Sequence, residues 1–155
     1  MSRLTLVASV LLLVSCGLGP EEQLEKAREH LAAGAYAEAA AAANDGLAAG
    51  AEGPTAWRLE LAALEGDARA ASTADVLSRL DRLAGAWSAQ MTGSLYVQTA
   101  GQLKEAGDAG GAISVLDAGA QRFPEDADIT RAIELSKQTG SAEEIERLRS
   151  LGYVE

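Results

Sequence analysis

Apolar residues recur along the chain with the spacing of amphipathic helices. In two segments they follow one another at intervals of four, three and four residues, which places them on one face of an α-helix. These stripes are Val76, Leu80, Leu83 and Trp87, and Ala112, Leu116, Gly119 and Phe123. Runs of Val, Ile and Thr, which are typical of strands, are missing after residue 16. The pattern predicts an all-α protein.

The helical patterns are separated by glycines, which are favoured just after a helix end because they adopt the left-handed conformation without strain. Four of these glycines lie 32, 41 and 33 residues apart, namely Gly34, Gly66, Gly107 and Gly140. Asp67, Asp108 and Ser141 follow three of them and can cap the next helix. Ser141 and Glu144 also fit a capping box. The same helix–glycine–cap joint is therefore repeated.

Three further breaks lie at residues 50–54, 88–93 and 123–126. The expected helices then form four pairs: 21–33 and 36–49, 54–65 and 68–87, 91–106 and 109–122, and 127–138 and 142–151. The interval of 41 residues predicts about two extra turns in the second pair, which we expect in helix 68–87. A turn signal at Asn44-Asp45-Gly46 leaves open whether helix 36–49 ends early.

A helix–turn–helix unit that recurs near 34 residues resembles the tetratricopeptide repeat. The best match is residues 93–126, through Tyr96, Ala100, Leu103, Gly107-Asp108, Ala112, Leu116 and Pro124. The first and second units match less fully, and the fourth is partial. The resemblance covers residues 21–155 and implies an α-solenoid of about four antiparallel helix pairs. A helical bundle is the alternative, and it would share most of the same core residues.

The resemblance also implies a binding function, because tetratricopeptide domains hold an extended peptide or a partner helix in a concave groove lined by the first helix of each pair. The matching positions are Glu21, Leu24, Arg28 and Leu31 in the first unit, and Val97, Gly101, Lys104 and Glu105 in the third. The implied partner is a protein or peptide rather than a small-molecule substrate. A clamp for a C-terminal carboxylate is set aside, because it uses Lys and Asn in the groove and Asn44 is expected on a second helix.

The N-terminus has the pattern of an export signal. Arg3 precedes an uncharged apolar run of 11 residues, 4–14, which as a helix would reach only about 16 Å. A bilayer core needs about 20 residues, so the run predicts a signal peptide rather than a membrane span. Leu13-Val14-Ser15-Cys16 resembles the bacterial lipobox. This resemblance implies that residues 1–15 are removed and that Cys16 carries a lipid; a chance Cys in a secreted or cytosolic protein is the alternative.

The expected domains are therefore a signal peptide (1–15), a lipidated cysteine with a short tether (16–20) and a helical repeat domain (21–155). Four tether residues, 17–20, span at most about 14 Å, so we expect the domain to work close to the membrane. Gly17 follows the cysteine in place of the Asp that often retains lipoproteins in the inner membrane. In a two-membrane bacterium this favours the outer membrane, facing the periplasm.

Composition narrows the function further. Residues 1–15 contain one Arg and no acid, so residues 16–155 hold 12 basic and 23 acidic side chains, a net charge of −11. This argues against nucleic acid as a partner. Cys16 is the only cysteine and His30 the only histidine, and neither suggests a metal or another cofactor. Trp57 and Trp87 lie at helical spacing and are expected in the core.

No catalytic or phosphate-binding motif is found in the sequence, and we do not expect an enzyme. The sequence predicts a membrane-anchored scaffold of the cell envelope that binds proteins, and that could assist the assembly of an envelope, secretion or pilus complex. The alternative is a permanent structural subunit of an envelope complex with no exchangeable ligand.

Overall fold

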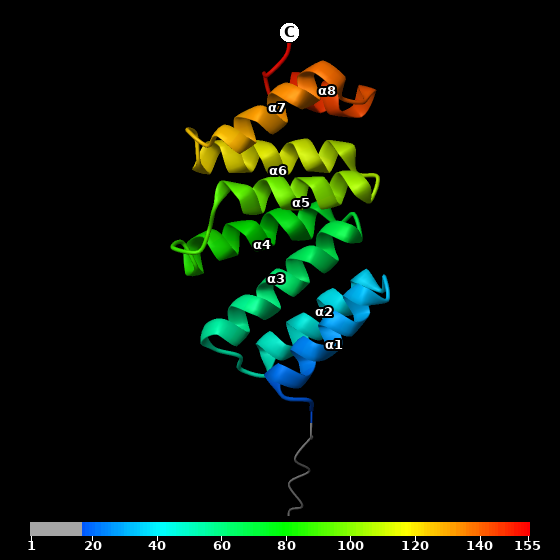
Figure 1. Cartoon of the computed structure of the whole chain (residues 1–155), viewed down its shortest axis with the longest axis vertical. Coiled ribbons are helices and arrows are strands. Elements are labelled where there is room, and N and C mark those ends of the chain that lie inside the picture. Colours follow the sequence, from blue (N-terminus) through cyan, green and yellow to red (C-terminus); the bar gives the residue numbers. More distant parts are fainter. Residues whose placement is uncertain (1–16) are drawn as a thin grey trace, which may run out of the picture.

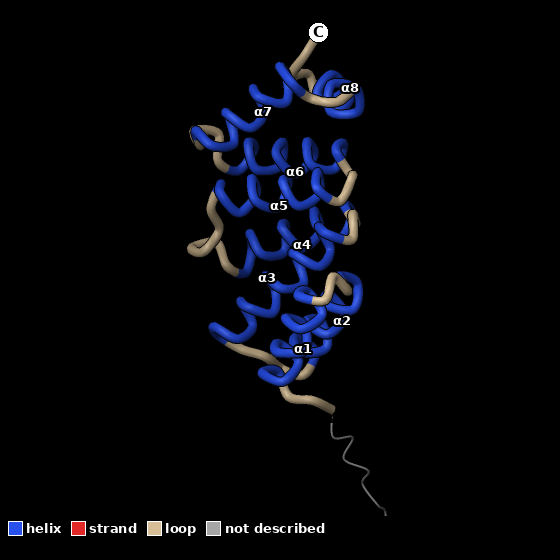
Figure 2. The backbone as a smooth tube through the Cα atoms, turned by 45° about the vertical axis from the view of Figure 1, so that its right-hand side comes forward, coloured by secondary structure: helices blue, strands red, loops and turns tan. Residues whose placement is uncertain are grey.

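The computed structural model describes residues 17–155, which form eight α-helices and no strand (Figure 2). The helices are α1 (Pro20–Ala32), α2 (Tyr36–Ala48), α3 (Gly53–Arg69), α4 (Thr73–Ala86), α5 (Gly93–Glu105), α6 (Ala109–Arg122), α7 (Ala127–Thr139) and α8 (Ala142–Ser150). The predicted all-α class and the four helix pairs are confirmed. Cys16 and the predicted signal peptide lie outside the described residues.

The helices are stacked in layers along the long axis of the molecule (Figure 1). α1 contacts α3, α3 contacts α5 and α5 contacts α7, so the odd-numbered helices form a continuous row. α4, α6 and α8 form a second row through α4–α6 and α6–α8 contacts. Each layer contacts its neighbours in the stack, as in other solenoids built from repeats. The surface of α1, α3, α5 and α7 is called the odd-helix face below.

Two clusters of buried apolar residues form the core, and α3 contributes to both. The first joins α1, α2 and α3 and consists of Leu24, Ala27, Ala42, Ala43, Leu59, Ala62 and Ala63. The second extends from the end of α3 to α8 and contains larger side chains such as Leu80, Leu103 and Ile129. Trp57 and Trp87 are half-buried and pack against this second cluster, with ring centroids 5.7 Å apart. Packing of the two tryptophans against the core agrees with the expectation from their helical spacing.

The predicted helix end at Gly66-Asp67 is wrong. α3 continues to Arg69, and the turn follows at Ala71, which has a φ of 56°. Gly66 lies inside the helix because α3 passes very close to the start of α2 there. A Cβ at Gly66 would lie 2.7 Å from the carbonyl oxygen of Tyr36, so the glycine permits a close helix crossing and does not end a helix.

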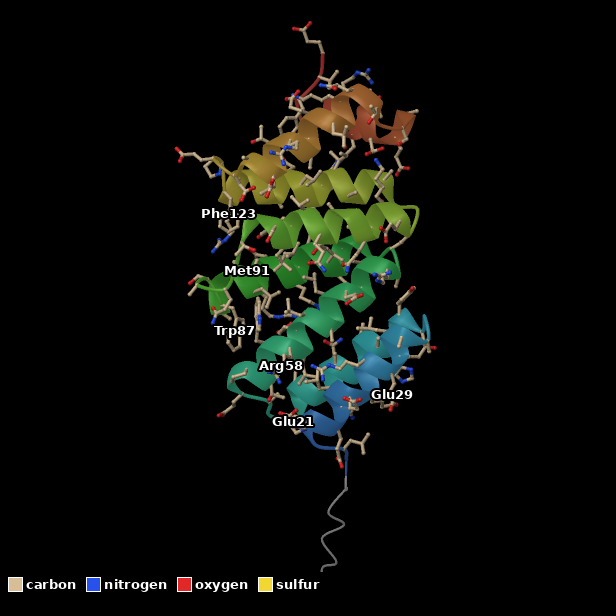
Figure 3. All side chains as sticks on the ribbon, in the orientation of Figure 1. Glu21, Glu29, Arg58, Trp87, Met91 and Phe123 are labelled. Carbon is tan, nitrogen blue, oxygen red and sulfur yellow. The ribbon has the colours of Figure 1, made fainter. Side chains whose placement is uncertain are left out.

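The extra length of the second pair also lies elsewhere than predicted. α4 ends at Ala86, whereas α3 has 17 residues and residues 87–92 form a longer connection to α5. Figure 3 shows Trp87 and Met91 of this connection along the same side of the molecule as Phe123. Met91 is buried in the second core cluster, so these residues form part of the packed core.

The turn signal at Asn44-Asp45-Gly46 does not end α2, which runs on to Ala48. Gly46 is buried, and a Cβ there would lie 2.9 Å from the Leu59 side chain of α3. Gly46 therefore has the same role as Gly66, a close approach of two helices. Among the described residues, no helix is long and apolar enough to cross a membrane.

Candidate functional site

The predicted groove positions of the first repeat unit do not form a common binding surface. Leu24 is only 2% exposed and belongs to the first core cluster, so its predicted place in a groove is wrong. Leu31 is half-buried against the same cluster. Glu21 accepts a hydrogen bond from Thr55, and Arg28 forms an exposed ion pair with its helical neighbour Glu25. The predicted residues of the first unit are therefore core side chains and charged side chains, and they do not line a groove.

Three of the predicted positions in the third unit line one groove, between α5 and α7. Val97, Gly101 and Lys104 face the groove from α5, whereas Glu105 is exposed and borders a separate small cavity near Arg69. The groove consists of two adjoining cavities of about 180 and 470 Å³, and both are lined by Val97, Ala132 and Leu135. Ala112, Ile113 and Leu116 of α6 line the smaller of the two cavities.

The middle of this α5–α7 groove is apolar and open. Leu135 of α7 is 57% exposed and, with Leu18, is one of two large apolar residues that are exposed in the described chain. Across from it, Gly101 has no side chain, and a Cβ at this position would meet no atom within 4 Å. A glycine in a helix interior costs about 1 kcal/mol relative to alanine. At Gly101 no close contact requires it, so its effect is to widen the groove.

A buried carboxylate closes one end of the groove. Glu144 of α8 is 1% exposed and accepts hydrogen bonds from Lys104 Nζ at 2.8 Å, Ser136 Oγ at 3.1 Å and the Ser141 backbone N–H at 2.9 Å. Burial raises the pKa of this carboxyl, but the hydrogen bonds and the charge of Lys104 outweigh burial and lower the pKa below its usual value. The ion pair joins α5 to α8 across the end of the groove.

Local sequence signals hold the helices around the groove. Ser141 and Glu144 form the predicted capping box at the start of α8, and Asp126 caps α7 by accepting hydrogen bonds from the backbone of residues 128 and 129. Gly93, at the start of α5, leaves the space that the Asp126 carboxylate occupies. The caps and this contact fix where α7 begins relative to α5, and hence the width of the groove.

A second depression, of about 180 Å³, lies on the other side of α5. Its lining residues are Leu61, Leu64, Glu65, Leu95, Gln98, Thr99 and Gln102 from α3 and α5. Gln98 borders both this α3–α5 depression and the α5–α7 groove. The two hollows thus flank α5 on the odd-helix face. The lining residues of α3 and α7 were not predicted, because the repeat pattern is weakest in the second and fourth units.

The other buried polar cluster lies away from the groove. Arg79 of α4 donates hydrogen bonds to Glu60 at 2.7 Å, Asp67 at 2.9 Å and Asn44 at 3.0 Å, and both ion pairs are buried. Burial outweighs the attraction of Arg79 and raises the pKa of the Asp67 carboxyl above its usual value. These contacts join α2, α3 and α4, so the cluster has a structural role. Among residues 17–155, no group of His, Cys, Asp and Glu side chains is arranged to hold a metal ion.

Comparisons with family models, with curated proteins and with solved structures find no match to this chain.

Proposed function

We propose that this protein is a lipid-anchored scaffold of a bacterial cell envelope, and that it binds a segment of a partner protein in the α5–α7 groove. The observation that carries the proposal is the groove itself: an apolar centre with exposed Leu135, widened by Gly101 and closed at one end by the Lys104–Glu144 pair. Apolar concave surfaces with a few polar groups are typical of binding sites.

The lipid-anchored residue in this proposal is Cys16, because residues 13–16 resemble the lipobox. α1 begins at Pro20, so only residues 17–19 separate the cysteine from the first helix. The N-terminal end of the described chain and α8 lie at opposite ends of the long axis (Figure 1). An anchored molecule standing on its N-terminal end would present the groove away from the lipid surface, toward proteins of the envelope.

The sparse exposed apolar surface supports an exchangeable partner over a permanent one. Within the described chain, only Leu18 and Leu135 are large apolar residues that are exposed. Permanent subunit interfaces are larger and more apolar than this. We therefore place the protein among adaptors that bind and release a partner, for example during assembly of an envelope, secretion or pilus complex.

Site-specific crosslinking in living cells tests the proposal. A photoreactive amino acid at Val97 or Leu135 is expected to capture a defined partner, whereas the same amino acid at Glu38, an exposed position on α2, is expected not to. The variant Gly101→Leu fills the open side of the groove and should abolish capture at Leu135. Equal capture at Glu38, or capture that survives Gly101→Leu, would show that the groove is not the binding site.

A further inference from the structure

A further cavity lies between α4 and α6, in the second row of helices. Its volume is about 310 Å³, and its lining residues are different from those of the α5–α7 groove. Leu77 and Leu80 of α4 and Ala118 of α6 form apolar walls, and Tyr96 lines it from α5. A volume at the lower end of the range for small-molecule sites suits a small ligand.

A glycine of α6 lets the Tyr96 side chain reach this α4–α6 cavity. A Cβ at Gly119 would lie 2.9 Å from Cβ and 3.0 Å from Cγ of Tyr96, so a larger residue there would push the ring away from α6. On the other side, the rings of Tyr96 and Phe123 pack edge to face with their centroids 5.9 Å apart. Tyr96 is 3% exposed, and these contacts fix the position of its ring.

The hydroxyl of Tyr96 is available to a ligand. In the described chain, the side-chain hydrogen bonds of α5 involve Ser94, Thr99 and Lys104, so the Tyr96 hydroxyl has no partner there. It is also not fully buried, because Gln23 Oε1 is the one fully buried side-chain polar atom without a partner among residues 17–155. The hydroxyl therefore opens into the cavity that Tyr96 lines.

Two opposite charges flank this hydroxyl. Burial raises the pKa of Tyr96, the Arg122 charge opposes this rise and the Asp81 charge adds to it, so both charges act on the same oxygen. Arg122 Nη2 donates a hydrogen bond to the Ala84 carbonyl oxygen at 2.9 Å, which holds the guanidinium at the C-terminal end of α4. A guanidinium has five N–H donors, so others remain for a ligand.

The two charges lie close together without pairing. Asp81 lies on the same face of α4 as Ala84, one helical turn earlier, which is a rise of about 4.5 Å. Among residues 17–155, the ion pairs of α4 run to α3, and Asp81 and Arg122 belong to none. A ligand with a single charge would be attracted by one of the two side chains and repelled by the other. Charge complementarity therefore favours a ligand that carries both signs.

We propose that the α4–α6 cavity binds the zwitterion of a free α-amino acid with an apolar side chain. The ammonium group meets the Asp81 carboxylate, and the carboxylate accepts hydrogen bonds from the Arg122 guanidinium and the Tyr96 hydroxyl. The apolar side chain lies against Leu77 and Leu80. An α-amino acid carries its two charged groups on neighbouring carbon atoms and can bridge two protein charges about one helical turn apart. The inference does not rest on the proposed scaffold function, because the groove has other lining residues.

Isothermal titration calorimetry of the purified protein with L-leucine tests the inference. L-leucine is expected to bind. Isocaproate has the same carbon skeleton without the ammonium group, and isoamylamine has it without the carboxylate. Each should bind at least about tenfold more weakly, because each loses a hydrogen bond between charged groups. This series needs no variant protein, so it tests the inference even if a substitution impairs folding.

Variants of the cavity give an independent measurement. Asp81→Asn, Arg122→Gln and Tyr96→Phe should each weaken the binding of L-leucine about tenfold, the loss of roughly one hydrogen bond. Asp45→Asn and Arg58→Gln make the same changes of charge at exposed positions of α2 and α3. These two controls should leave the binding of L-leucine unchanged.

The inference and the scaffold function can fail separately. Absence of L-leucine binding would overturn the inference, as would binding of isocaproate or isoamylamine as tight as that of L-leucine, because one charge of the cavity would then suffice. Gly101→Leu fills the groove and should leave the binding of L-leucine unchanged. Asp81→Asn should leave crosslinking at Leu135 unchanged, so a loss of crosslinking in this variant would contradict two independent sites.

Discussion

At the scale of single residues, two glycines inside helices have opposite environments. At Gly66 a Cβ would collide with the backbone of α2, whereas at Gly101 it would project into the open groove. Gly66 is thus required by the close packing of α3 against α2. Gly101 lowers the stability of its helix relative to alanine, and no close contact requires a glycine there. The sequence alone cannot separate the two cases, because both look like interruptions of a helical pattern.

The two glycines therefore give opposite results when replaced by alanine. Gly66→Ala should lower the free energy of unfolding by about 1–3 kcal/mol, the usual cost of overpacking. Gly101→Ala should raise it by about 0.5–1 kcal/mol, since alanine is the better helix former. Urea unfolding followed by circular dichroism measures both. Destabilisation by Gly101→Ala would mean that the groove is more tightly packed than the structure indicates.

Glu144 predicts a pH dependence of stability. Its pKa is lowered on folding from a usual value of 4.5. The stabilisation is therefore complete above pH 4.5 and is lost as the pH falls through the lower pKa of the folded state. Glu144→Gln should cost about 2 kcal/mol at pH 7, in line with hydrogen bonds to a charged group, and the difference from the natural protein should narrow below pH 4.5.

The comparison with the variant is necessary because Asp67 acts in the opposite direction. Its pKa is raised by burial, so its contribution favours the folded state more as the pH falls. Subtracting the unfolding free energies of the two proteins at each pH removes this effect. A difference that stays constant from pH 7 to pH 3 would exclude the ionised Glu144 as the source of the stabilisation.

At the scale of elements, the existence of the helices could be predicted and some of their boundaries could not. Local signals suffice where a cap acts on its own helix, as Ser141 does for α8 and Asp108 for α6. They fail where a residue acts on a distant helix. Asp67 resembles a cap in the sequence but bonds to Arg79 of α4, and Asn44 resembles a turn but bonds to the same arginine.

The same limit applies to the candidate site. Val97, Gly101 and Lys104 could be predicted because their repeat unit is regular. Leu135 could not, because its helix belongs to the partial fourth unit. Leu24 was misplaced because it packs into the alanine-rich core cluster of α1, α2 and α3.

The buried contacts of Arg79 give a prediction at this scale. Arg79→Met leaves Glu60 and Asp67 buried without their partner, which should cost about 3–5 kcal/mol of unfolding free energy. Arg82→Met is the matched control: Arg82 is half-exposed and meets Glu60 at 3.3 Å, so the loss should be at most about 1 kcal/mol. Adding Glu60→Gln and Asp67→Asn to Arg79→Met should restore part of the stability. Equal effects of the two arginine variants would contradict a joining role for the buried cluster.

At the scale of the whole molecule, the order of the helix layers relates the proposed lipid anchor to the groove. The described chain starts beside α1 and ends beyond α8, at the opposite end of the long axis (Figure 1). Because each layer contacts its neighbours, the number of stacked helix layers sets the distance between the two ends of the long axis. A lipid on Cys16 would therefore hold the first layer near the membrane and leave the α5–α7 groove several helix layers away from it.

The anchor itself is tested by Cys16→Ser, which removes the only thiol in the chain. The natural protein is expected in the membrane fraction and to incorporate radiolabelled fatty acid, because two or more acyl chains give stable attachment. The variant should incorporate none and leave the membrane fraction. Cys16 precedes the first helix, which begins at Pro20, so the unfolding free energy of the helical domain should not change. If the variant incorporates no fatty acid and still stays in the membrane fraction, a contact other than the lipid holds the protein there.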